Sequence, residues 1–205
     1  MTEKADEKVE KAQFEAIIKE DKVYIFDEKA IDEFYNNSYI GTLEEKDTGE
    51  QSLILEPIEV LLLCERNRLL LWKDNNKTNQ MYSFEDLLIE FTQYDPRLWQ
   101  KYIIYMDLRK RGYIVRAGYG DGIDFRVYKR GADINTDAAK YLIYPVFEGY
   151  PIELKDLDKM SRVAMSSRKA LIVATVDRLS KPIYYSVNKF EIITKIDIDE
   201  EEYAR

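Results

Sequence analysis

The stretch "FRVYKRGADINTDAAKYLIY" spans residues 125–144 and frames a position that could present a catalytic side chain. Tyr128 closes a first strand-like run, a basic turn follows, and a second strand begins at Lys140. Ala138 lies just ahead of that strand and carries no functional group, and the chain contains no histidine. Taken singly, Tyr128 is typical of an aromatic side chain on a sheet, and Lys169 of a surface charge at a helix-to-strand junction.

Two other segments could carry chemistry. "AGYGDGIDF" has Gly118, Gly120 and Gly122 in a spacing that suggests a phosphate-binding loop. It lacks the Gly-Lys-Ser/Thr ending of a P-loop, and no helix follows to receive the phosphate, so the pattern predicts a hairpin turn.

Asp124 and Glu153, with Lys155, imitate the carboxylates and lysine of metal-dependent nucleases. Such sites need two carboxylates that converge on magnesium from adjacent strands. Glu153 follows Pro151 and opens a predicted helix, so this hypothesis stays a minor alternative. With one cysteine, Cys64, and no Cys/His cluster, we expect no disulfide, no zinc site and no cofactor.

The charge is unevenly distributed. The net charge of −8 argues mildly against nucleic-acid binding, but both ends of the chain are acidic and one central segment is basic. Because physiological salt screens charges beyond about 8 Å, such a segment can still bind phosphate locally. Composition leaves open whether these side chains bind phosphate or form a solvated helix face. They are Arg97, Lys101, Arg109, Lys110, Arg111, Arg116, Lys129 and Arg130.

The composition, 45% hydrophobic and 34% charged, is ordinary for a soluble globular protein. No run approaches the roughly 20 apolar residues of a membrane helix. The N-terminus is charged from its first residues, which predicts no signal peptide. We expect a cytoplasmic protein with no membrane contact.

The hydrophobic periodicity predicts an α/β (α+β) fold of two small mixed modules, 1–95 and 96–205. In the first, a partly helical start at 7–21 precedes a strand at 22–26, a helix at 28–39 and a further helix after Pro57. A strand at 68–74 and a helix from Ser83, with Asp86 in a capping-box position, complete it.

The second module begins with a helix over 95–112, with Asp95 as its N-cap and Pro96 in its first position. Its remainder is rich in strands, and one helix at 153–169 interrupts them. The strands are predicted at 113–118, 123–131, 140–147, 170–177, 182–187 and 190–196. The apolar face of the helix is predicted from Leu154, Leu157, Met160, Val163 and Ala164.

Several motifs, taken in order, resemble the archaeal tRNA-splicing endonucleases: "DLRKRGYIVRAGYGDGIDFRVYKRGA", "KYLIYPV", "SRVAMSSRKALIVATVD" and "PIYYSV". The family carries LRxRGYxVKxG, GxDFRxYxRG, a histidine shortly before xYLVxV, and RxAxSxRKxLxxAxVD. The segments "VYIFDEKAIDEFYNNSYIGTLEE" and "LILEPIEVLLLCERNRLLLW" are similar to the family's N-terminal module. The resemblance implies a C-terminal nuclease domain with a central mixed sheet flanked by helices.

The family cleaves RNA without metal, using a tyrosine, a histidine and a lysine. By this resemblance the tyrosine is Tyr128, the lysine is Lys169, and the histidine position holds Ala138. Tyr128 would take the proton of the 2′-hydroxyl, the missing imidazole would protonate the leaving 5′-oxygen, and Lys169 would stabilise the phosphorane. Because loss of general acid catalysis costs roughly 10²–10⁴ in rate, we expect this chain to bind RNA and cleave it very poorly.

Two explanations for Ala138 remain. One is deliberate substitution, the usual device for trapping a nuclease on uncut substrate. The other is natural loss in a non-catalytic structural subunit of a heterotetramer. Retention of Tyr128 and Lys169 favours the first, since a subunit released from catalysis should drift at all three positions.

The resemblance also implies a substrate, precursor tRNA with a bulge–helix–bulge, and products with 2′,3′-cyclic phosphate and 5′-hydroxyl ends. Arg162 matches one arginine of a base clamp, and a helix-surface salt bridge is its alternative role. The second clamp position falls near Tyr184, which departs from the family. Arg168 and Arg126 are the further RNA-binding candidates.

Family chains with one copy of each module form tetramers of one or two subunit types, so we expect a homotetramer, or else a heterotetramer. In homotetramers an acidic loop docks into a basic pocket of a neighbour. The matching loop, "VDRLSKP", has Asp177 but also Arg178 and Lys181. The strands at 182–187 and 190–196 are candidates for pairing across a subunit interface.

Overall fold

The computed structural model describes residues 12–19, 22–46, 49–73, 80–120, 122–147, 149 and 151–188. The predicted mixed α/β fold is confirmed, with two five-stranded sheets. Among the described helices, none is long and apolar enough to cross a membrane. The strand predicted at 190–196 lies outside the described residues.

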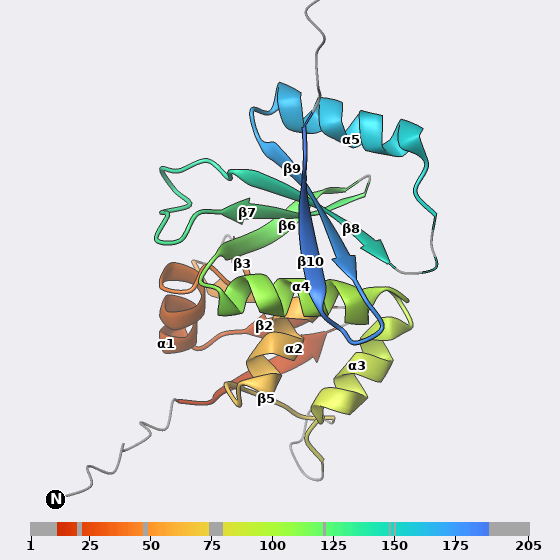
Figure 1. The fold of residues 1–205 in the computed structure, drawn as a ribbon. Helices are drawn as coiled ribbons and strands as arrows, with labels where there is room; N and C mark the ends of the chain where they lie inside the picture. Colours follow the sequence, from red (N-terminus) through yellow and green to blue (C-terminus); the bar gives the residue numbers. More distant parts are fainter. Residues whose placement is uncertain are drawn as a thin grey trace, which may run out of the picture.

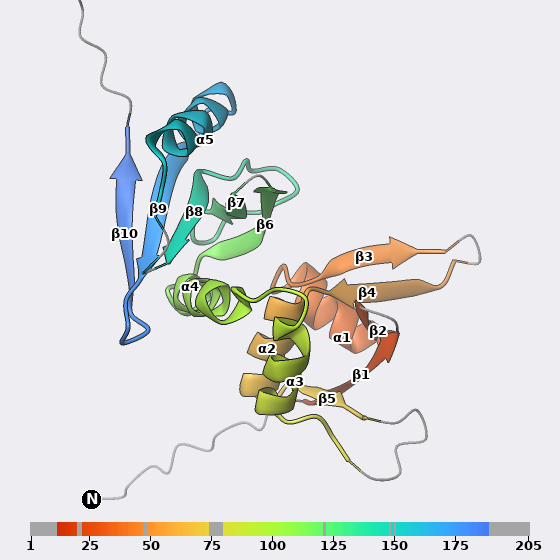
Figure 2. The ribbon, with the colours of Figure 1, turned by 90° about the vertical axis from the view of Figure 1, so that its right-hand side faces the viewer.

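The N-terminal module is a sheet in the order β3-β4-β2-β1-β5, with helices packed on it (Figures 1 and 2). Val23 and Ile25 point into the core from one face of β2, as strand alternation requires. The elements are β1 (Phe14–Lys19), β2 (Lys22–Ile25), α1 (Glu28–Ile31), the π-helical turn η1 (Asp32–Asn36), β3 (Thr42–Glu45), β4 (Gln51–Leu55), α2 (Pro57–Glu65), β5 (Leu69–Leu71) and α3 (Phe84–Thr92).

Local sequence explains where two of these helices start. Pro57 occupies the first turn of α2, and Ser83 and Asp86 form the predicted capping box of α3, with reciprocal hydrogen bonds of 3.1 Å. The helical start predicted at 7–21 is wrong over its described part, because residues 14–19 form β1. That strand pairs antiparallel with β2 and parallel with β5, so partners distant in sequence override the local pattern.

The second module is a mixed sheet in the order β10-β9-β8-β7-β6, in which only β8 and β9 run parallel among the described strands. Its elements are α4 (Leu98–Lys110), β6 (Ile114–Gly120), β7 (Ile123–Tyr128), β8 (Tyr141–Phe147), α5 (Leu154–Ser166), β9 (Ala170–Val176) and β10 (Pro182–Val187). The glycine segment is a hairpin turn between β6 and β7, as predicted.

Helices α4 and α5 cover opposite faces of this sheet, and α4 lies between it and the first module (Figure 1). Met160 and Ala164 of α5 are buried against Leu142 and Leu171. Leu154 is 83% exposed, so its predicted place on the apolar face is wrong; it is the first residue of α5 and lies beyond the sheet contact. Helix α4 joins a core cluster that runs through both modules.

The start of α4 differs from the prediction. The helix begins at Leu98, and Asp95 forms a turn before it: its carboxylate accepts from the N–H of Arg97 at 3.0 Å and its carbonyl from that of Leu98 at 2.9 Å. The carboxylate also binds Lys101, with 2.9 Å between Oδ2 and Nζ. Lys101 thereby reaches Asp124 of β7 as well, at 3.3 Å, and ties this turn to the second sheet.

The two carboxylates around Lys101 have opposite pKa shifts. Burial raises the pKa of Asp124, and the nearby Lys101 offsets this only in part. Burial also acts on Asp95, but hydrogen bonds from Lys101 and from the N–H of Arg97 outweigh it and lower the pKa. Ionised Asp95 therefore stabilises the fold, whereas ionisation of Asp124 opposes it.

We expect Asp95→Asn and Asp124→Asn to show opposite pH dependence of stability. The stability from Asp95 is present above its unfolded pKa of about 3.9 and is lost as pH falls through the lowered folded value, so the cost of Asp95→Asn shrinks on acidification. The stability that protonated Asp124 contributes is lost as pH rises through its raised folded pKa. The stability of the parent relative to Asp124→Asn therefore declines with rising pH. Urea midpoints between about pH 3 and 7 measure both trends. Parallel trends in the two variants would contradict the assignment.

Candidate active site

Strand register brings the three predicted catalytic positions to one end of the second sheet. Strand β7 runs antiparallel to β8, with Val127 opposite Tyr141, and β8 runs parallel to β9, with Tyr141 opposite Ala170. Therefore the end of β7 and the starts of β8 and β9 lie side by side. Tyr128 is the last residue of β7, Ala138 lies three residues before β8, and Lys169 directly precedes β9; the loop from β7 to β8 projects there (Figure 1).

Backbone hydrogen bonds fix this junction. The N–H of Lys140 donates to the carbonyl of Val127 at 2.9 Å, and the N–H of Ala170 donates to the carbonyl of Lys140 at 3.0 Å. Lys140 thus joins the strands that bear Tyr128 and Lys169. The spacing of the three positions is set by main-chain geometry.

Tyr128 is held by apolar neighbours. Its side chain is buried and forms a small cluster with Ile114 and Ala139, and Tyr39, Ala132 and Ile134 pack against this cluster. Tyr39 comes from the N-terminal module, and no local pattern in the sequence predicts this contact. The ring of Tyr128 is therefore confined on several sides.

Lys169 lies at the junction of α5 and β9. Its N–H donates to the carbonyl of Ala164 at 2.9 Å, and its ammonium group donates to the carbonyl of Ser167 at 3.0 Å. Arg168 has a φ of +55°, a left-handed conformation that ends the helix, as a glycine often does. This reversal turns the chain from α5 into β9 and holds the half-buried Lys169 at the sheet end.

Ala138 is exposed at the end of an ordered loop, while Ala139 is buried beside Tyr128. The order comes from aspartates: Asp137 accepts from the N–H of Asp133 at 3.0 Å, and Asp133 accepts from the N–H of Asn135 at 2.9 Å. The bond from Asn135 to Asp133 is typical of an Asx turn, and the bond from Asp133 to Asp137 closes the loop. The loop conformation therefore does not depend on the side chain at position 138.

The RNA-binding candidates differ in their surroundings. Arg168 adjoins Lys169 directly. Arg126 lies two residues before Tyr128, on the same face of β7; its Nε donates to the carbonyl of Ala117 at 2.8 Å. The Arg162 side chain is 77% exposed on α5 and pairs with Asp158 at 2.8 Å, the surface salt bridge that was its alternative role.

The carboxylates of the minor metal hypothesis are each paired with a lysine. Asp124 binds Lys101 at 3.3 Å, and Glu153 binds Lys155 at 2.6 Å on the surface before α5. Within the described ranges, no three His, Cys, Asp or Glu side chains are grouped so that they could hold a metal ion.

Several residues of the basic segment have a structural role that the sequence did not reveal. Arg109 donates to the carbonyl of Ser38 at 2.7 Å, and Arg116 donates to those of Tyr39 and Gly41 at 3.1 and 2.5 Å. Both arginines therefore bind the N-terminal module. A count of basic residues could not distinguish this structural role from phosphate binding.

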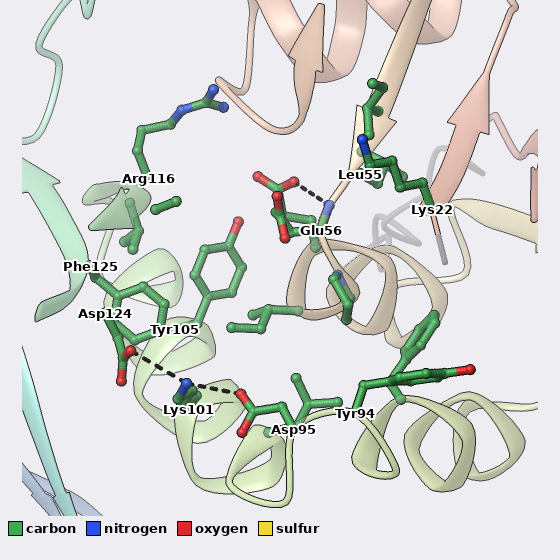
Figure 3. A pocket seen from close by; sticks show the side chains of 18 residues that line it. Lys22, Leu55, Glu56, Tyr94, Asp95, Lys101, Tyr105, Arg116, Asp124 and Phe125 are labelled. Atoms are coloured by element: carbon green, nitrogen blue, oxygen red, sulfur yellow. Dashed lines mark hydrogen bonds and ion pairs between the residues drawn. The ribbon is translucent and has the colours of Figure 1, made fainter. Parts of the chain in front are cut away.

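A cleft of about 430 Å³ separates the two modules near Arg116 (Figure 3). Glu59 is buried in its wall and accepts from the N–H groups of Gly41 at 2.9 Å and Glu56 at 3.0 Å. Burial raises the pKa of Glu59 despite these hydrogen bonds. The charged residues that line the cleft are Lys22, Glu56, Glu59, Asp95, Lys101, Arg116 and Asp124.

Comparison with known proteins covers most of the chain. The family model of the tRNA intron endonuclease N-terminal domain matches residues 14–88, and that of the catalytic C-terminal domain matches residues 98–185. The tRNA-splicing endonuclease of Methanococcus vannielii is 35% identical over 161 residues, which covers 77% of this chain and 89% of the relative. That of Thermococcus onnurineus is 33% identical over 167 residues, covering 82% and 91%.

The relatives differ in length. The tRNA-splicing endonuclease of Methanococcoides burtonii is 37% identical over 174 residues, which is 85% of this chain but 46% of the relative, so the chain spans about half of that protein. Because both family domains match in order and these relatives cover most of the chain, the chain belongs to the tRNA-splicing endonuclease family, as its motifs predicted.

Proposed function

We propose that this chain has the framework of a metal-independent endoribonuclease that excises introns from precursor tRNA, and that Ala138 impairs it. The observation that carries the proposal is the convergence of Tyr128, position 138 and Lys169 at one end of the sheet, in a chain of this family. The substrate implies a cytoplasmic site of action.

The proposed reaction is attack of a 2′-oxygen on the adjacent phosphorus, which breaks the bond to the 5′-oxygen. Tyr128 takes the proton of the 2′-hydroxyl, and Lys169 balances the negative charge on the non-bridging oxygens. The 5′-oxygen leaves with the electron pair and needs a proton. A histidine at position 138 would supply it, whereas alanine leaves this step to water. The products are a 2′,3′-cyclic phosphate and a 5′-hydroxyl.

We expect Ala138→His to raise the cleavage rate of a bulge–helix–bulge RNA about 10²–10⁴-fold in EDTA, because it restores a general acid. Thr136→His is the matched control, since it adds an imidazole to an exposed position of the same loop. Single-turnover assays with analysis of the product ends measure both.

Each outcome of this experiment assigns a role. Cleavage by Ala138→His alone supports a disabled catalytic site. If both variants bind RNA and neither cleaves, the chain is better explained as a structural subunit that needs a catalytic partner. Cleavage that EDTA abolishes would favour the metal hypothesis with Asp124 and Glu153.

Recognition of the bulge is proposed for the arginines around this sheet end. Arg162 would stack on an unpaired base, and Arg168 and Arg126 would contact the RNA backbone. The ion pair of Arg162 with Asp158 is exposed, and such pairs contribute little, so its loss on binding costs little.

Arg162→Ala should weaken binding of the bulged RNA by roughly tenfold, since cation–π stacking on a desolvated base contributes about 1–2 kcal/mol. Arg111→Ala is the matched control, because Arg111 makes the same i, i+4 pair at 2.8 Å, with Asp107 on α4. Filter binding to bulged RNA and to an unbulged duplex gives the comparison. If both variants lose RNA affinity by the same small factor, Arg162 contributes only as a surface charge and does not stack on a base.

Self-association into a homotetramer is the proposed assembly, and a heterotetramer with a second subunit type is the alternative. Among the described strands, β10 is at the edge of its sheet and exposes Ile183 and Tyr185. Unpaired edge strands with apolar side chains favour pairing with another chain. The loop before β10 is a tight turn, in which Asp177 accepts from the N–H groups of Leu179 and Lys181, each at 2.9 Å.

Light scattering should give four times the chain mass of 24.3 kDa for the parent. The double variant Ile183→Lys/Tyr185→Lys should give a smaller species, because charged side chains block pairing along an edge. A monomeric parent would exclude the homotetramer.

A further inference from the structure

The loop at residues 38–41 of the N-terminal module is held by side-chain hydrogen bonds on both sides. Arg109 donates to the carbonyl of Ser38 at 2.7 Å, and Arg116 donates to the carbonyls of Tyr39 and Gly41. From the other side, buried Glu59 accepts the N–H of Gly41 at 2.9 Å. Hydrogen bonds from guanidinium groups are stronger than neutral ones, so Arg109 and Arg116 fix this loop relative to α4 and β6.

Tyr39 occupies this loop with a φ of +54°, a left-handed conformation that is uncommon for a bulky residue. Glycine would adopt the same conformation without steric cost. Such a cost persists where the surroundings determine the conformation, and these outliers are concentrated at functional sites. Here the surroundings are the two arginines and Glu59.

The side chain of Tyr39 packs against the cluster of Ile114, Tyr128 and Ala139. Tyr39 therefore packs against a cluster that contains both the proposed base, Tyr128, and Ala139, the residue next to position 138. The contact crosses from one module to the other, between the loop after η1 and the adjacent strands β6 and β7 of the second sheet. Among the described hydrophobic residues of the N-terminal module, Tyr39 alone packs against this cluster.

We propose that Tyr39 is a positioning residue for Tyr128, through which the N-terminal module holds the catalytic tyrosine in place; this inference rests on the proposed function. The arginines and Glu59 fix the loop, the loop fixes the ring of Tyr39, and that ring closes one side of the Tyr128 cluster. A misplacement of about 1 Å in a catalytic group can cost roughly 100-fold in rate. The N-terminal module thereby takes part in the reaction without touching the reacting atoms.

The experiment compares variants of Tyr39 in the Ala138→His background. Tyr39→Gly removes the side chain and suits the left-handed backbone, so it is expected to fold. Tyr39→Phe keeps the ring. Tyr24→Ala is the matched control, since Tyr24 is a half-buried tyrosine of the same module that stacks on Phe26 instead.

We expect Tyr39→Gly to slow single-turnover cleavage by about 10–100-fold while the RNA dissociation constant stays within about twofold. Tyr39→Phe and Tyr24→Ala should cleave like their parent, because both leave the packing of the ring at position 39 intact. Cleavage by Tyr39→Gly at the parental rate would overturn the proposal. A loss of RNA affinity that accounts for the slower cleavage would also overturn it, because Tyr39 would then contact the substrate.

A second measurement does not depend on cleavage. In the chain with Ala138, hydrogen exchange of the amides between residues 127 and 140 should be faster in Tyr39→Gly than in Tyr24→Ala, because the cluster that anchors the loop has lost one side. Unchanged exchange would overturn the proposal even if the Ala138→His parent proves inert. An inert parent with the expected exchange would refute the proposed function and leave the packing role of Tyr39 supported.

Discussion

The backbone of Lys140 makes the hydrogen bonds on which the site depends. Its N–H bonds to β7 and its carbonyl to β9, so one residue sets the separation of the strands that carry Tyr128 and Lys169. Parallel pairing of β8 with β9 requires a crossover, and α5 provides it. The crossover ends at Arg168, and Lys169 is consequently delivered to the end of the sheet where β7 also ends.

The two modules share one hydrophobic core because helix α4 packs against both. Its buried side chains join a core with α2, α3 and the second sheet, and Lys101 ties its first turn to β7. Arg109 at its far end reaches the loop that carries Tyr39. A helix fixed at both ends in this way holds the first module in a set position relative to the strands of the second. The hydrophobic core continues across the boundary predicted at residue 95.

The sequence predicted the strands from 113 to 187 well, because alternation of apolar residues is a local property. It failed at residues 14–19, where the strand exists only because β2 and β5 lie beside it. At Asp95 the local cap signal predicts the helix start two residues too early, because Asp95 forms a turn before α4 and its carboxylate binds Lys101 as well. The roles of Arg109 and Arg116 depend on a loop some 70 residues away, with separations of 71 to 77 residues, and local spacing carries no trace of such pairs.

The side chain at position 138 has a role in the proposed catalysis but makes little contribution to the fold. The loop is ordered by Asp133 and Asp137, and the buried contact beside Tyr128 is made by Ala139. An exposed side chain at 138 contributes little to either, and surface changes away from such contacts alter stability by roughly 0.5 kcal/mol or less. An alanine at this exposed position therefore leaves the packing of Tyr128 and the hydrogen bonds of Lys169 undisturbed. Under the proposed function, the side chain at position 138 would serve the reaction, and the contacts that hold Tyr128 and Lys169 would persist whichever side chain stands there.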